Sequence, residues 1–115
     1  MALNDAAKNI GLDAIGDAIL FMGLHNGDPS TTGANEIAGG SPAYARQPID
    51  FNAAATGNLD SSLQPTFDVP ATTVQYVSYW SAVTGGIFYG SKAVTNEVFA
   101  AQGQYTIDDV DISLT

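Results

Sequence analysis

The first pattern of apolar and polar residues along the chain is that of a helix. Apolar residues recur at helical spacing after Asn4, at positions Ala6, Ala7, Ile10, Ala14 and Ile15. Asparagine is a favoured N-cap, because its side-chain oxygen accepts a free backbone N–H of the first turn. We therefore predict a short N-terminal α-helix from residue 4 to about residue 17, in a helical segment that spans residues 1–17.

From residue 18 the pattern changes to short apolar runs between turn residues. The run 18–25 ends at the turn signal Asn26-Gly27-Asp28-Pro29. Further strands are predicted at 48–53, 65–69, 73–82, 86–89, 97–101 and 105–114. Apolar and polar residues alternate in two of them, as in half-buried antiparallel strands. The pattern predicts one mainly β domain, an antiparallel, jelly-roll-like β-sandwich over residues 18–115 that joins the helix in one compact unit.

Residues 27–47 form a long segment rich in glycine and proline, without sustained periodicity. A loop of this length in a small domain is usually functional, part of an interface, or disordered. We therefore expect this loop to be the most informative part of the chain.

Charge narrows the choice of partners. The chain has 3 basic and 12 acidic residues and a formal net charge of −9. Three basic residues cannot neutralise several phosphates or bind an anionic lipid surface. We therefore expect neither a nucleic-acid nor a membrane partner.

The chain has no cysteine, which excludes disulfides, thiolate zinc sites and thiol catalysis. Neither a membrane-spanning run nor a signal peptide is recognised, so synthesis and assembly in a cytoplasm are expected.

Catalytic chemistry has one candidate centre. His25 is the only histidine, and Asp28 and Ser30 follow it closely. Such a local cluster seldom has the geometry of a catalytic triad, and a histidine that bonds to the adjacent turn is the simpler interpretation. Pairs of carboxylates suited to glycoside hydrolysis are expected by chance among twelve acids. We predict no enzymatic activity.

Two groups of oxygen ligands are candidates for calcium. They are Asp108, Asp109 and Asp111, and Asp28 with Asn35 and Glu36. Neither group has the spacing of an EF-hand loop. A β-bulge at residues 108–109, which would let Ile107 and Val110 both point inward, is the alternative for the first group. No cofactor or metal is predicted.

Glu36 and Arg46 are the candidates for a structural clasp within the loop. Arg46 is the only arginine of the chain, and it lies ten residues beyond Glu36, across the Gly39-Gly40 turn. A bidentate pair between them would tie the two sides of that turn together. The alternative is an ordinary surface ion pair, which contributes less than about 1 kcal/mol.

Aromatic residues concentrate between residues 76 and 89. Tyr79 and Trp80 are neighbours on a predicted strand, so their side chains point to opposite faces and one of them points away from the core. That side chain is a candidate contact with another copy, a larger scaffold or a sugar. Packing across a thin sandwich is the alternative.

Ordered motifs extend over nearly the whole chain. They are Leu24-His25-Asn26-Gly27-Asp28-Pro29, Thr32-Gly33-Ala34-Asn35-Glu36, Gly39-Gly40, Tyr44-Ala45-Arg46-Gln47, Phe67-Asp68-Val69-Pro70, Val83-Thr84-Gly85-Gly86-Ile87-Phe88-Tyr89-Gly90 and Gln102-Gly103-Gln104-Tyr105-Thr106. With these motifs the sequence resembles a family of small structural proteins of tailed bacteriophages, which are described as tail-fibre, minor tail or head-decoration proteins.

The resemblance implies a non-enzymatic virion protein, assembled in the host cytoplasm, and it supplies no catalytic residue. One domain without heptads for a coiled-coil shaft favours a capsid decoration protein on the assembled particle. The alternative is a minor tail or tail-fibre module that binds a receptor or a carbohydrate. Expected partners are other copies of the chain, as a trimer, and the major capsid or tail proteins. The expected interface residues are Ile10, Ile15, Asp28, Pro29, Tyr79 and Trp80.

Overall fold

The computed structural model describes residues 2–114 and begins with one helix, α1 (Asp5–Ala18). The side chain of Asn4 accepts a hydrogen bond from the backbone N–H of Ala7 at 3.0 Å, as expected of the predicted N-cap. A methyl group on Gly16 would lie 3.3 Å from Leu59, and one on Gly11 would lie 3.1 Å from Leu114. These glycines therefore let the helix lie close to the strands beside it.

The remaining elements of the described chain are strands in antiparallel sheets. They are β1 (Phe21–His25), β2 (Gln47–Pro48), β3 (Asn58–Asp60), β4 (Thr66–Val69), β5 (Thr72–Trp80), β6 (Phe88–Phe99), β7 (Gly103–Thr106) and β8 (Asp111–Ser113). A four-stranded sheet has the order β2-β1-β5-β6, and two-stranded sheets pair β3 with β8 and β4 with β7. The structure confirms a mainly β chain with one short helix. The complete sandwich and its jelly-roll connectivity stay predictions.

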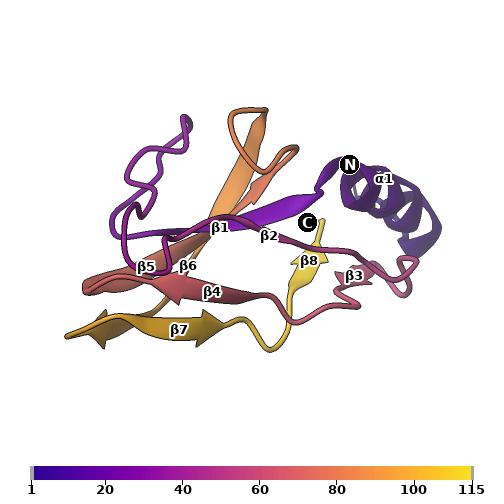
Figure 1. Cartoon of the computed structure of the whole chain (residues 1–115). Helices are drawn as coiled ribbons and strands as arrows, with labels where there is room; N and C mark the ends of the chain where they lie inside the picture. The colour runs from indigo at the N-terminus through magenta and orange to yellow at the C-terminus, as the bar shows by residue number, and fades with distance from the viewer. Residues whose placement is uncertain (1, 115) are drawn as a thin grey trace.

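The molecule is elongated, with extents of 46 × 25 × 25 Å. Figure 1 shows the four-stranded sheet above the β4–β7 pair, with α1, β3 and β8 gathered at one end. The buried core includes Met22 and Leu24 from β1, Val77 from β5, and Phe67 and Val69 from β4. In the described part of the chain, α1 lacks the length and the apolar run that a membrane-crossing helix requires.

Four strand predictions were wrong in their extent. The predicted strand 48–53 is reduced to β2, and Phe51 makes only a single β-bridge with Ser61. The predicted strands 86–89 and 97–101 both overlap β6, a single strand from Phe88 to Phe99. It continues between them through small and polar residues because β5 pairs with it on one side. The predicted strand 105–114 is divided into β7 and β8, so residues 108–109 separate two strands that pair with different partners.

A two-residue turn connects Ala55 and Asn58, which exchange both of their backbone hydrogen bonds at 2.9 Å. Both turn residues have positive φ angles, 50° at Thr56 and 74° at Gly57. Glycine adopts this conformation readily, whereas the branched threonine side chain is strained in it. The turn lies against α1, because Asn9 accepts a hydrogen bond from the N–H of Gly57 at 3.0 Å.

We predict that replacing Thr56 with Asn raises the free energy of unfolding by about 1 kcal/mol, because asparagine tolerates positive φ. Urea denaturation of both proteins measures the difference. Thr56→Val serves as the control, since its branched side chain keeps the strain and should give no gain. Equal stability of the wild type and the Thr56→Asn variant would contradict the prediction.

Candidate functional site: a polar network beneath two surface segments

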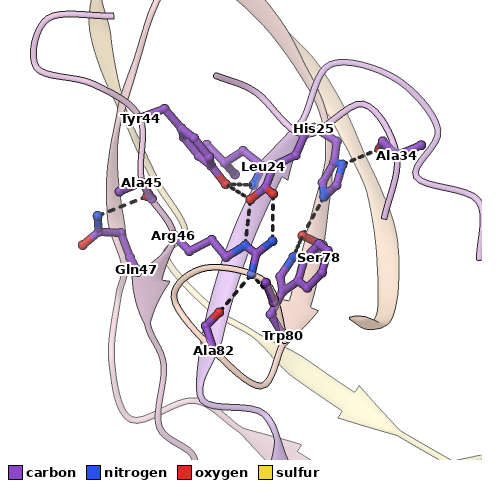
Figure 2. A network of polar contacts seen from close by, with 12 residues as sticks. Leu24, His25, Ala34, Tyr44, Ala45, Arg46, Gln47, Ser78, Trp80 and Ala82 are labelled. Atoms are coloured by element: carbon purple, nitrogen blue, oxygen red, sulfur yellow. Dashed lines mark hydrogen bonds and ion pairs between the residues drawn. The ribbon is translucent and has the colours of Figure 1, made fainter. Parts of the chain in front are cut away.

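Two segments rise from the same side of the four-stranded sheet (Figure 1). One is the β1–β2 connection, residues 26–46, and the other is the β5–β6 turn, residues 81–87. The connection is joined to β1 by a β-bridge between His25 and Glu36, and by a hydrogen bond from the N–H of Ile37 to the carbonyl of Leu24 at 3.0 Å. A network of polar side chains lies between these segments and the sheet (Figure 2).

Arg46 is the centre of this network. Its Nε and Nη2 donate to the two carboxylate oxygens of Glu36, each at 2.9 Å, which is the bidentate geometry of a guanidinium. Its Nη1 donates to the carbonyls of Ala82 at 3.0 Å and Gly85 at 2.8 Å. Only 8% of the Arg46 side chain is exposed, so water screens these contacts little. The structure therefore forms the pair that the sequence suggested, and extends it to a second segment.

Tyr44 completes the hydrogen bonding of Glu36. Its hydroxyl donates to Oε2 of Glu36 at 2.8 Å and accepts from the backbone N–H of Leu24 at 2.9 Å. Burial raises the pKa of Tyr44, and the neighbouring Glu36 carboxylate raises it further. The hydroxyl thus stays protonated and available as a donor. Because this hydroxyl also accepts from Leu24 of β1, Tyr44 attaches the β1–β2 connection to β1.

Trp80 lies beneath Arg46 rather than at the surface. The guanidinium carbon is 3.5 Å from the centroid of the indole ring, a cation–π contact. On its other sides the ring contacts Phe88, with centroids 5.1 Å apart, and Gly33, where a Cβ atom would lie 2.5 Å from the ring. Gly33 is therefore required for this packing. Trp80 is on the opposite face from Tyr79, as predicted, but the two segments cover it.

His25 is fully buried, and both of its ring nitrogens have partners. Nδ1 lies 2.8 Å from the carbonyl of Ala34, and Nε2 lies 2.7 Å from Oγ of Ser78. A carbonyl can only accept, so Nδ1 carries the proton and the Ser78 hydroxyl donates to Nε2. The indole N–H of Trp80 donates to the same hydroxyl at 2.8 Å. The direction of every hydrogen bond in this row is thereby determined.

Burial lowers the pKa of His25 below its ordinary value of 6.5, and the Arg46 charge adds to this effect. The carbonyl of Ala34 and the Glu36 carboxylate act in the opposite direction. Protonation would turn Nε2 into a donor, and the Ser78 hydroxyl would lose its acceptor. The network therefore requires the neutral imidazole.

The candidate catalytic residues do not form a reactive group. The carboxylate of Asp28 accepts from the N–H of Ser30 at 2.8 Å, which is a local turn contact. The ring of His25 is directed to Ala34 and Ser78 instead. Because the imidazole is buried and fully hydrogen-bonded, it is not available to a substrate.

The two candidate calcium groups are rearranged. Asp109 and Asp111 lie with Asp60, their carboxylates within 4.8 Å of one another and exposed, because β8 pairs with β3. Hydrogen bonding with Asp111 raises the pKa of Asp60 and of Asp109. Hydrogen bonding with Asp60 in turn lowers the pKa of Asp111. In the second group, the carboxylate of Glu36 is already occupied by Arg46.

The expected interface residues differ in accessibility. Ile10 is 75% exposed, and Asp28 is also exposed. Pro29 and Trp80 are buried. Ile15 and Tyr79 are half-buried and line an apolar cavity between α1 and the sheet.

Several members of the network carry no local sequence signal. Ser78 is 53 residues from His25, and only the pairing of β1 with β5 brings them to one face. Gly23 lies opposite Ser78 in that pairing, and a Cβ atom there would be 2.9 Å from oxygens of Glu36, Tyr44 and Ser78. A glycine inside an apolar strand was the available signal, since it marks a close approach.

A hollow of about 360 Å³ opens between the two segments, and its lining includes Glu36, Gly39, Tyr44, Val83 and Gly85. Arg46 lines the hollow as well, and its guanidinium is hydrogen-bonded to both segments. The polar network therefore fixes the positions of the two walls of the hollow.

Comparison with known proteins identifies a family. The family model described as Podophage GP4 fiber I protein gp80 matches residues 16–115. The matched region contains all of the strands and the whole network, and residues 1–15 lie outside it. No curated protein and no solved structure matches the chain.

Replacing Arg46 with Lys should lower the free energy of unfolding by about 2 kcal/mol, because lysine lacks the planar fork that bonds both segments. Cleavage by a protease within residues 27–47 should become faster. Lys92→Arg is the matched control, because Lys92 is exposed and its replacement should leave both measurements unchanged. An unaltered cleavage rate in Arg46→Lys would show that Arg46 does not hold the connection.

The folded protein should lose stability as the pH falls below 6.5. A histidine whose folded-state pKa is lowered contributes fully above the unfolded value of 6.5. Below it, the unfolded chain binds the proton first, so stability falls by up to about 1.4 kcal/mol per pH unit until the folded-state pKa is reached. NMR titration of the single imidazole tests this directly. We expect a midpoint below 6.5, and a midpoint at or above 6.5 would refute the prediction.

Proposed function

This chain belongs to the family of podophage GP4 fiber I protein gp80, and from this premise we propose that it is a structural component of a phage tail fibre. The family match over residues 16–115 carries the proposal. It also confirms the resemblance to structural proteins of tailed phages. We propose further that the chain acts by docking to other virion proteins in the particle rather than by catalysis.

The surface made by the two segments supports a docking role. The β5–β6 turn exposes two apolar side chains, Val83 at 47% and Ile87 at 60%. Arg46 holds the carbonyls of this turn and the carboxylate of Glu36 in the connection at the same time. Loops that are ordered before binding lose less conformational entropy when a partner docks. We infer that this surface contacts a neighbouring fibre or tail protein.

The second candidate function is capsid decoration, in which the protein binds the surface of the phage head. The size of a single domain and the lack of heptads for a coiled-coil shaft support it. It shares the docking mechanism with the fibre proposal, and the two differ in location on the particle. The family description names a fibre, which is why we favour the tail.

Electron microscopy of phage particles labelled with an antibody fragment against this chain separates the two placements. The fibre proposal expects label on the fibres and none on the capsid. The same fragment, pre-incubated with free chain, gives the matched control for specific labelling. Label confined to the capsid would establish decoration instead, and the absence of the chain from purified particles would reject both.

A further inference from the structure

His25 is closed between a central strand and a surface segment. The chain has one histidine and no cysteine, so His25 is the one side chain whose ordinary pKa lies near neutrality. It is completely buried on β1, which lies between β2 and β5 in the four-stranded sheet. The β1–β2 connection covers it, through the carbonyl of Ala34 and the β-bridge with Glu36. The connection therefore separates the imidazole from water.

The closed structure cannot accommodate a second proton on this imidazole. Nδ1 already donates to Ala34, so an added proton must go to Nε2. There it meets the hydroxyl of Ser78, which donates to Nε2 and already accepts from the indole N–H of Trp80. Two hydrogens would then lie between Nε2 and Oγ, which are 2.7 Å apart. The Ser78 hydroxyl would have to turn away and give up its acceptor, which is costly in a buried site.

The charged groups around His25 do not compensate for a second buried cation. Glu36 favours protonation of the ring and Arg46 opposes it, and both belong to the connection. The Glu36 carboxylate is already engaged, because Arg46 donates to both of its oxygens and Tyr44 donates to one. The neighbouring strand β5, where Tyr76 lies opposite His25, has no charged residue. Since a buried charge without its own partner is strongly unfavourable, a protonated His25 must reach water.

Water reaches the ring at the lowest cost when the connection moves away. Moving His25 itself would break the pairing of β1 with β5, which extends over the whole of β1. The connection is held beside His25 by two backbone hydrogen bonds, from Ile37 to Leu24 at 3.0 Å and from Asn26 to Asn35 at 3.1 Å. Opening of this segment therefore exposes the imidazole and leaves the sheet intact.

We propose that protonation of His25 opens the β1–β2 connection while the sheets stay folded, so that acid disrupts the surface made by the two segments. Displacement of Glu36 removes the carboxylate that holds Arg46, and Arg46 in turn fixes the carbonyls of Ala82 and Gly85 in the β5–β6 turn. The consequence for docking rests on the function proposed above. The opening itself is a property of the isolated chain.

Trp80 reports the opening, because it is the only tryptophan of the chain. The connection covers its ring with Gly33 and Arg46, and Trp80 is 7% exposed. We expect acrylamide quenching to increase in one reversible transition, at the midpoint that NMR gives for the His25 imidazole, while circular dichroism retains the sheet signal. Protonation of the ring with Trp80 still shielded would overturn the proposal. A ring that stays neutral throughout, or until the sheet unfolds, would overturn it as well.

Hydrogen exchange distinguishes opening of the connection from global unfolding. The open form binds the proton at the ordinary pKa of 6.5, whereas burial lowers the pKa in the closed form. After correction for intrinsic exchange rates, the opening constant of residues 26–37 should therefore rise about tenfold for each pH unit below 6.5. It should not depend on low concentrations of urea. Amides of the β4–β7 pair should show a smaller constant that increases with urea. Equal constants and equal urea dependence in both regions would refute the proposal.

Two variants identify the titrating group. His25→Asn has no ionisable ring and should abolish the transition. Asp60→Asn is the matched control, because Asp60 is exposed and its raised pKa brings its titration closer to that of the imidazole. It should leave the midpoint unchanged. Persistence of the transition in His25→Asn, or a shifted midpoint in Asp60→Asn, would contradict the proposal.

The measurements on the wild type decide the question if His25→Asn does not fold. All of them use the isolated chain, so their outcome is independent of the antibody labelling that tests the place of the protein on the particle.

Discussion

The guanidinium of Arg46 is the contact on which the arrangement of the surface segments depends. It is held by the carboxylate of Glu36, by two carbonyls of the β5–β6 turn and by the face of Trp80. A buried arginine is favourable only where its charge and its donors are matched. Here the matching groups come from two segments far apart in the sequence, so burying one side chain brings both segments to one position.

The buried row of Trp80, Ser78 and His25 continues this arrangement into the sheet. Each group donates to the next, and His25 finally donates to the carbonyl of Ala34 in the β1–β2 connection. The connection is therefore held to the sheet at Ala34, through Glu36 and through Tyr44. A surface fixed at several points suits a protein that occupies one place in an assembled particle, because rigid contacts lose little entropy on docking.

How far the sequence predicted this structure depends on how local each signal was. The cap of α1 and the alternating strand β5 depend on neighbouring residues, and they were predicted. The Glu36–Arg46 pair was also found, because the chain offers one arginine and few charges to match it. The middle of β6 was missed, since its small and polar residues resemble a turn until β5 pairs with them. The Asp60 carboxylate joined Asp109 and Asp111 only through the β3–β8 pairing, which no local pattern indicates.

Hydrogen exchange of the wild type and of Arg46→Lys tests most directly whether one side chain positions both segments. The account predicts that amides in residues 26–46 and 81–87 lose protection together in the variant, while the β4–β7 pair keeps its protection. Loss of protection in one segment alone, or in neither, would contradict the central claim.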